Sequence, residues 1–160
     1  AAADALAALK IAVALNPNPD PDGAGPKVAP VLSPYQIMAA DVVGTDGRVT
    51  SADALAILKM AVGLPGAPAP GWMFVDEERD FYDETTGTFT LDRNHTTWDP
   101  TINVPVQGDT TANLVGVLKG DVNGSWTPPA NTVYVESLAP NYFATLAQTL
   151  NTPQAQWGIV

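Results

Sequence analysis

Residues Asp41 to Leu64 read DVVGTDGRVTSADALAILKMAVGL, and they join a run of oxygen-bearing side chains directly to an amphipathic helix pattern. Counted back from Asp53, the spacing is that of a calcium-binding loop, in which oxygens at positions 1, 3, 5, 7, 9 and 12 surround a glycine at position 6. Gly47 takes position 6, and the segment 42–45 carries one extra residue. The predicted ligands are Asp41, Thr45, Asp46, the Arg48 carbonyl, Thr50 and Asp53.

The same stretch has a second interpretation that needs no metal. An Asp-Gly pair between apolar segments is common in turns, and a Thr or Ser ahead of a helix is a common N-cap. Thr50 and Ser51 stand at that place. From the spacing alone, a calcium loop and a capped turn are both open.

The helix half of this stretch is repeated at the start of the chain. AAADALAALKIAVAL, residues 1–15, matches TSADALAILKMAVGL, residues 50–64, position for position, and Asp4 aligns with Asp53. The pattern predicts a helix over residues 3–15 with Leu6, Leu9 and Val13 on one stripe. Such repetition is typical of a paired module.

Together with GDVNGSW, residues 120–126, the two repeats resemble the dockerin domain of extracellular bacterial proteins. The resemblance covers less than a third of the chain. It implies two EF-hand-like calcium loops, each followed by a helix, and attachment of a secreted protein to a cohesin partner on a scaffold.

Two further segments carry oxygen ligands at alternate positions. Asp121, Asn123 and Ser125 have the spacing of half of a calcium loop, and one hypothesis is that this half-loop folds back towards Asp4 and forms a second calcium site with it. The alternative is a plain Asx turn. Asn18, Asp20 and Asp22 form a weaker candidate in a proline-rich segment, where an extended acidic linker is favoured.

Composition excludes several function classes. The net charge is −10 with only 7 Lys and Arg, so the chain lacks the basic surface that a nucleic-acid partner needs. There is no cysteine, which excludes disulfides and thiolate sites. No apolar run is long enough to span a membrane, and no signal-peptide pattern is present. We expect an extracellular or cell-surface location.

The remaining chain predicts short elements. Ser33-Pro34 opens a short helix, and helix 53–63 ends at Gly63. Predicted strands cover 72–75, 81–84 paired with 88–92, 101–106, a buried 112–118 and 133–135, and a helix begins near residue 140. The acidic cluster over 76–84 invites a two-carboxylate hydrolase hypothesis, but a solvated loop is favoured. His95 is expected to have a surface or capping role.

The sequence thus predicts an α+β fold, with a dockerin-like calcium-binding helical half at 1–66 and a half with short antiparallel strands and a C-terminal helix at 67–160. The predicted function is a non-enzymatic, extracellular calcium-binding module that attaches its protein to a partner, either a cohesin-like scaffold or a second copy. The alternative is a carbohydrate-binding or accessory module of a secreted polysaccharide-degrading enzyme, with tryptophans that stack on sugars.

Overall fold

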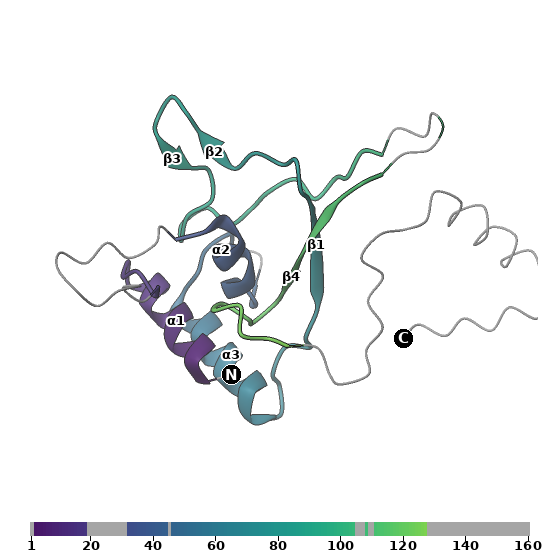
Figure 1. The fold of residues 1–160 in the computed structure, drawn as a ribbon. Helices are drawn as coiled ribbons and strands as arrows, with labels where there is room; N and C mark the ends of the chain where they lie inside the picture. Colours follow the sequence, from purple (N-terminus) through teal and green to yellow (C-terminus); the bar gives the residue numbers. More distant parts are fainter. Residues whose placement is uncertain (1, 19–31, 45, 105–107, 109–110, 128–160) are drawn as a thin grey trace, which may run out of the picture.

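A computed structural model describes residues 2–18, 32–44, 46–104, 108 and 111–127. This part of the chain mixes helices with short antiparallel strands, as an α+β fold requires (Figure 1). The predicted strand 133–135 and the C-terminal helix lie outside the described residues. The elements are α1 (Ala2–Ala12), α2 (Pro34–Ala40), α3 (Ser51–Val62), β1 (Trp72–Asp76), β2 (Tyr82–Asp83), β3 (Thr88–Phe89) and β4 (Leu114–Leu118).

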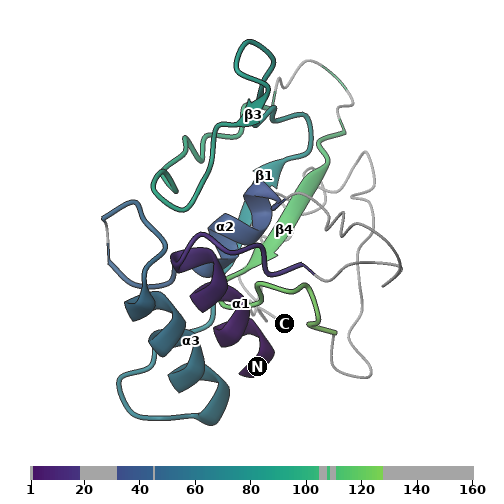
Figure 2. The same ribbon diagram turned by 90° about the vertical axis from the view of Figure 1, so that its left-hand side faces the viewer.

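The two repeat helices, α1 and α3, pack directly against each other (Figures 1 and 2). Small side chains on the facing sides, among them Ala5, Ala8 and Ala54, allow a close approach, and Ile57 is almost fully buried beside them. The helices run in opposite directions, since Asp4 at the start of α1 lines the same cavity as Met60 near the end of α3.

Each helix has recognisable end signals. Ser33 caps α2 and forms a capping box with Gln36, with Pro34 in the first turn. Thr50 caps α3 in the same way with Asp53, and Gly63 ends α3 with a left-handed φ of 66°. The predicted cap at Ser33 and stop at Gly63 are therefore confirmed.

The strands form two small antiparallel sheets. β1 pairs with β4, with Phe74 opposite Gly116, and β2 pairs with β3. The strand predicted over 112–118 is present as β4, but its predicted burial is wrong: along β4 only Val117 is buried, because the other face of this two-stranded sheet is exposed. The predicted strand 101–106 is also wrong, since residues 101–104 form no strand.

One hydrophobic cluster joins the helices to the sheet. It contains Ile11 and Ile57 from the helix pair, Val75 and Val117 from the β1–β4 sheet, and Val122 after β4. α2 lies between the helix pair and this sheet, and the β2–β3 hairpin projects at the opposite end from α1 and α3 (Figures 1 and 2). This arrangement brings the chain after β4 back to the repeat helices.

Candidate functional site

Asp53 is the centre of the 41–53 segment, and it is only 1 % exposed. Its Oδ1 accepts hydrogen bonds from the backbone N–H groups of Val42 at 3.0 Å and Val43 at 2.9 Å. Its Oδ2 accepts from the backbone N–H of Thr50 at 2.8 Å and from the Thr50 hydroxyl at 2.9 Å. The Asp53 carboxylate therefore binds Val42 and Val43 at the start of the loop and Thr50 near its end, and it forms part of the cap of α3.

Asp4 holds the equivalent place at the start of α1 and is equally buried. Its Oδ1 accepts the backbone N–H of Asn123 at 3.1 Å, across 119 residues of sequence. The structure thus places the 121–125 segment against Asp4, as one of the two hypotheses from the sequence has it. The Asx turn of the other hypothesis is present as well, since Asn123 Oδ1 accepts the Ser125 N–H at 2.9 Å. Gln36 supports it from α2, where its Nε2 donates to the Val122 carbonyl at 3.1 Å.

The two sites share one pattern. In each site, the residue after an Asp-Val pair donates its backbone N–H to the buried carboxylate of a helix. Val43 donates to Asp53, and Asn123 donates to Asp4. Residues 121–123 are therefore the counterpart of residues 41–43. The chain after β4 thus makes the contact with Asp4 that the 41–43 segment makes with Asp53.

The segment 93–97 forms hydrogen bonds with the 41–53 loop, a contact that the sequence did not predict. The Thr96 hydroxyl donates to Asp41 Oδ2 at 2.5 Å, and the backbone N–H of Thr96 donates to the Gly47 carbonyl at 3.0 Å. The Val49 N–H donates to the Arg93 carbonyl at 2.8 Å. The partners are far apart in sequence, and no local pattern marks them.

As placed, these residues do not form a shell of calcium ligands. Within the described residues no group of three or more Asp, Glu, His or Cys side chains is arranged to hold a metal ion. The Asp53 oxygens accept N–H and O–H donors, and Asp46 Oδ1 accepts the Arg48 N–H at 3.2 Å. Asp121 accepts the N–H groups of Ser125 and Trp126. Thr45, Asp20 and Asp22 lie outside the described residues, and Asn18 bonds to the Gln36 side chain.

Negative charge still collects at the 41–53 loop. Burial raises the pKa of Asp41 above its ordinary value, and although the Thr96 hydroxyl opposes this, the charges of Asp53 and Asp46 raise the pKa further. Lys119 also acts to lower it. Ionisation of Asp41 therefore requires more free energy in the folded chain than in the unfolded chain.

This raised pKa predicts a pH dependence of stability. The folded chain binds the Asp41 proton more tightly than the unfolded chain, so the free energy of unfolding falls as the pH rises from the ordinary Asp pKa of about 3.9 towards the raised value. Asp41→Asn keeps an oxygen for Thr96 and carries no charge, so its stability relative to wild type should increase across that window. Urea unfolding of both proteins at a series of pH values measures the difference in their free energies of unfolding. A difference that stays constant with pH would contradict a raised pKa of Asp41.

Gly47 gives a second prediction at this loop. Its φ is +67°, and a Cβ added there would lie 2.9 Å from the Thr97 Oγ1. We expect Gly47→Ala to cost about 1–2 kcal/mol in backbone strain, with the contact to Thr97 adding to this. Gly124→Ala is the matched control, because Gly124 has a φ of +65° with nothing within 4 Å of the added Cβ. Equal melting temperatures for the two variants would show that the Thr97 contact does not matter.

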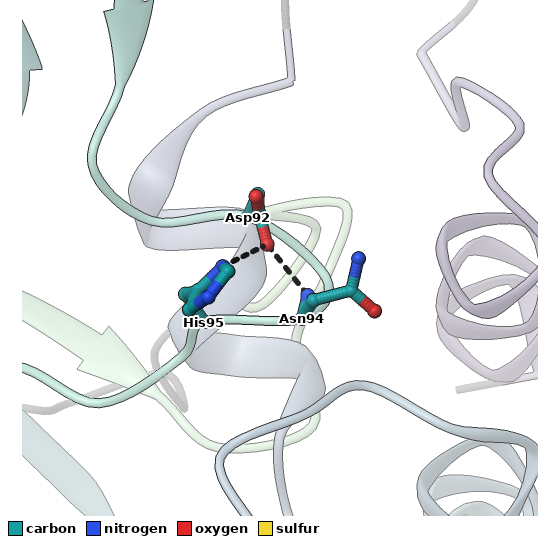
Figure 3. Close-up of polar contacts among 3 residues, drawn as sticks. All are labelled: Asp92, Asn94 and His95. Carbon is teal, nitrogen blue, oxygen red and sulfur yellow. Dashed lines mark hydrogen bonds and ion pairs between the residues drawn. The ribbon is translucent and has the colours of Figure 1, made fainter.

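His95 and three acids of the 76–84 cluster make local turn contacts. Asp92 Oδ1 accepts the Asn94 N–H at 2.6 Å and lies 3.2 Å from His95 Nδ1 (Figure 3). Partial burial would raise the pKa of Asp92, but these contacts hold it below its usual range. Asp76, Asp80 and Asp83 likewise accept the N–H of a residue two positions ahead. These are turn contacts on exposed residues.

The sequence predicts that Leu6, Leu9 and Val13 lie on one stripe of the first helix. In the structure, the side chains of these three residues are exposed to solvent. The equivalent residues of α3 are exposed as well, so the inward sides of both helices carry the small residues instead. The exposed fractions of these six side chains lie between 41 and 60 %. The residues are Leu6 and Leu9 in α1 with Val13 directly after it, and Leu55, Leu58 and Val62 in α3. We call them the two leucine stripes. The helix predicted over 3–15 ends earlier than expected, at Ala12.

No helix in the described part of the chain is long and apolar enough to cross a membrane. Comparison with protein-family models, with curated proteins and with solved structures finds no match to this chain.

Proposed function

We propose that the chain is an extracellular attachment module of dockerin-like build, in which two loop-helix units present apolar helix faces to a protein partner. The observation that carries the proposal is the pair of leucine stripes. Exposed apolar side chains are ordinary when scattered singly, but two rows at equivalent positions of a repeat are not scattered. Amphipathic helices that bind partners use this kind of spacing.

The inward faces explain why the stripes point outward. Each helix already buries two or three alanines and an isoleucine, together with the carboxylate that accepts N–H groups of a loop. The leucines are therefore not needed for the core of the described fold. Their burial against a partner would contribute roughly 25 cal/mol per Å² of apolar surface, against the entropy cost of association.

The partner class is a protein with an apolar surface, and the probes are purified cohesin domains and the chain itself. We expect association with one of them that Leu9→Glu in α1 or Leu58→Glu in α3 weakens at least about tenfold, the equivalent of 1.4 kcal/mol. The two residues are 42 % and 41 % exposed, so neither change disturbs a buried site. Sedimentation velocity reports self-association, and calorimetry reports cohesin binding.

Leu114→Glu is the matched control, since Leu114 is 46 % exposed but lies on β4 instead of a stripe. It should leave the association unchanged. No association with either probe at about 100 µM, or equal effects of all three substitutions, would reject the stripes as the attachment surface.

Calcium enters this proposal through residue types and spacing. The 41–53 loop and the Asp4–Asn123 contact bring together oxygen-rich segments of the kind that calcium prefers. The crowding of negative charge at Asp41 also favours a cation. The metal-free arrangement is nevertheless closed by hydrogen bonds, so we propose calcium as a ligand that adds stability to these loops and not as a requirement for folding.

A further inference from the structure

An open cleft of about 690 Å³ lies beside the β1–β4 sheet, away from the leucine stripes. Its walls come from the start of β1, from β4, from α2 and from the segment after β4. Most of its lining is apolar, with a few amide side chains among the apolar groups. Concave sites of this size and composition are typical of small-ligand binding.

Two tryptophans form one corner of the cleft. Trp72 and Trp126 meet edge to face, with ring centroids 5.0 Å apart and an interplanar angle of 84°. They remain 46 % and 41 % exposed, so a large aromatic surface is left uncovered in the described structure. Trp98, by contrast, is half-buried and packs edge to face against Phe81.

Contacts hold the Trp72 ring and the Trp126 backbone in place. The Trp72 ring lies over Gly116, where an added Cβ would be 3.3 Å from its Cζ3 atom. The Trp126 backbone N–H donates to Asp121 Oδ2 at 3.1 Å, and Asn123 of the same turn is anchored to Asp4. The rigid turn and the absence of a side chain at Gly116 preorganise the corner for a flat ligand.

The polar lining indicates the charge of that ligand. No Lys, Arg or His is among the described residues that line the cleft, which disfavours an anion. Its charged residue is Asp121, and both of its oxygens already accept backbone N–H groups. The Asn123 Nδ2 makes no hydrogen bond within the described part of the chain, and it is available as a donor.

We propose that this cleft binds a neutral saccharide. A sugar ring has an apolar C–H face that packs on an indole and a rim of hydroxyls that amides can bind, which matches an exposed tryptophan corner with amides and no cation. This activity goes beyond attachment through the helices, and the residues involved are different. The tryptophan corner, rather than a flat row of rings, predicts recognition of one or two sugar units at the end of a chain.

The test is a titration of neutral hexasaccharides of glucose, xylose, mannose and N-acetylglucosamine, followed by tryptophan fluorescence and calorimetry. We expect saturable binding of at least one, weakened at least tenfold by Trp72→Ala and by Trp126→Ala. Trp126→Phe should retain part of the affinity, because a smaller ring face remains. Tyr82→Ala is the matched control: Tyr82 is 45 % exposed and also packs edge to face, against Phe89, but does not line this cleft.

Circular dichroism melts of each variant separate loss of binding from loss of fold. Failure of every hexasaccharide to bind the folded wild type would overturn the proposal, as would binding that Trp72→Ala leaves unchanged. Binding of choline but of no saccharide would replace it with a cation site between the rings. None of these results bears on the leucine stripes, whose variants and probes are different.

Discussion

Asp53→Ala should lower the free energy of unfolding by about 3 kcal/mol, the largest loss that we expect from a single substitution near the loop. The carboxylate accepts three backbone N–H groups and one hydroxyl. Alanine leaves those donors without an acceptor and also removes the capping box of α3. Urea unfolding monitored by circular dichroism measures the change.

Two further substitutions make this result specific. Asp53→Asn should cost less than Asp53→Ala, because the amide retains one acceptor oxygen. It should still cost stability, because either the N–H groups of Val42 and Val43 or the donors of Thr50 then face an NH₂ group instead of an acceptor. Asp46→Ala is the matched control: it removes an acid from the same loop, but an exposed one whose side chain, within the described residues, accepts a hydrogen bond from the Arg48 N–H alone. A cost for Asp46→Ala equal to that for Asp53→Ala would contradict a special role for the buried carboxylate.

Asp4→Ala should cost about 2 kcal/mol and should loosen α1 together with the turn after β4. Asp4 is 1 % exposed and accepts the Asn123 N–H, so its removal leaves a polar group unpaired at the contact that joins the start of the described chain to its end. Hydrogen exchange measured by NMR should show faster exchange at the Asn123 amide and along α1.

Asn123→Ala is the control, because it changes the side chain and keeps the backbone N–H that Asp4 receives. It should leave exchange in α1 close to that of wild type. Slow exchange at position 123 in the Asp4→Ala variant would show that the turn is held by other contacts and that Asp4 is not its anchor.

Local signals predicted the helices well. A serine followed by a proline marks the start of α2, and a glycine marks the end of α3. The repeated pattern locates α1 and α3 to within a few residues. β1 and the pairing of β2 with β3 were also predictable, since the apolar run and the Thr86-Gly87 turn are local features. Signals of this kind act over one turn of chain, where sequence and structure are most tightly linked.

What the sequence did not reveal depends on contacts between distant segments. The exposure of the leucine stripes could not be predicted, because a helix with alanines on one side and leucines on the other has two apolar faces and only packing decides which is buried. Thr96 was missed for a similar reason, since its bond to Asp41 spans 55 residues. The contact of Asn123 with Asp4 was predictable only through the repeat, which aligns Asp4 with Asp53.

We propose that residues 41–53, and residues 121–125 with Asp4, are two versions of one loop-helix unit that binds calcium. The most direct test is a calorimetric titration of calcium into chelator-stripped protein, with a thermal melt at each end. We expect saturable binding at two sites and a rise in melting temperature, with about 2.7 kcal/mol of added stability per site at free calcium 100 times the Kd. No heat of binding, with identical melts in calcium and in chelator, would contradict it and leave the two buried carboxylates as purely structural caps.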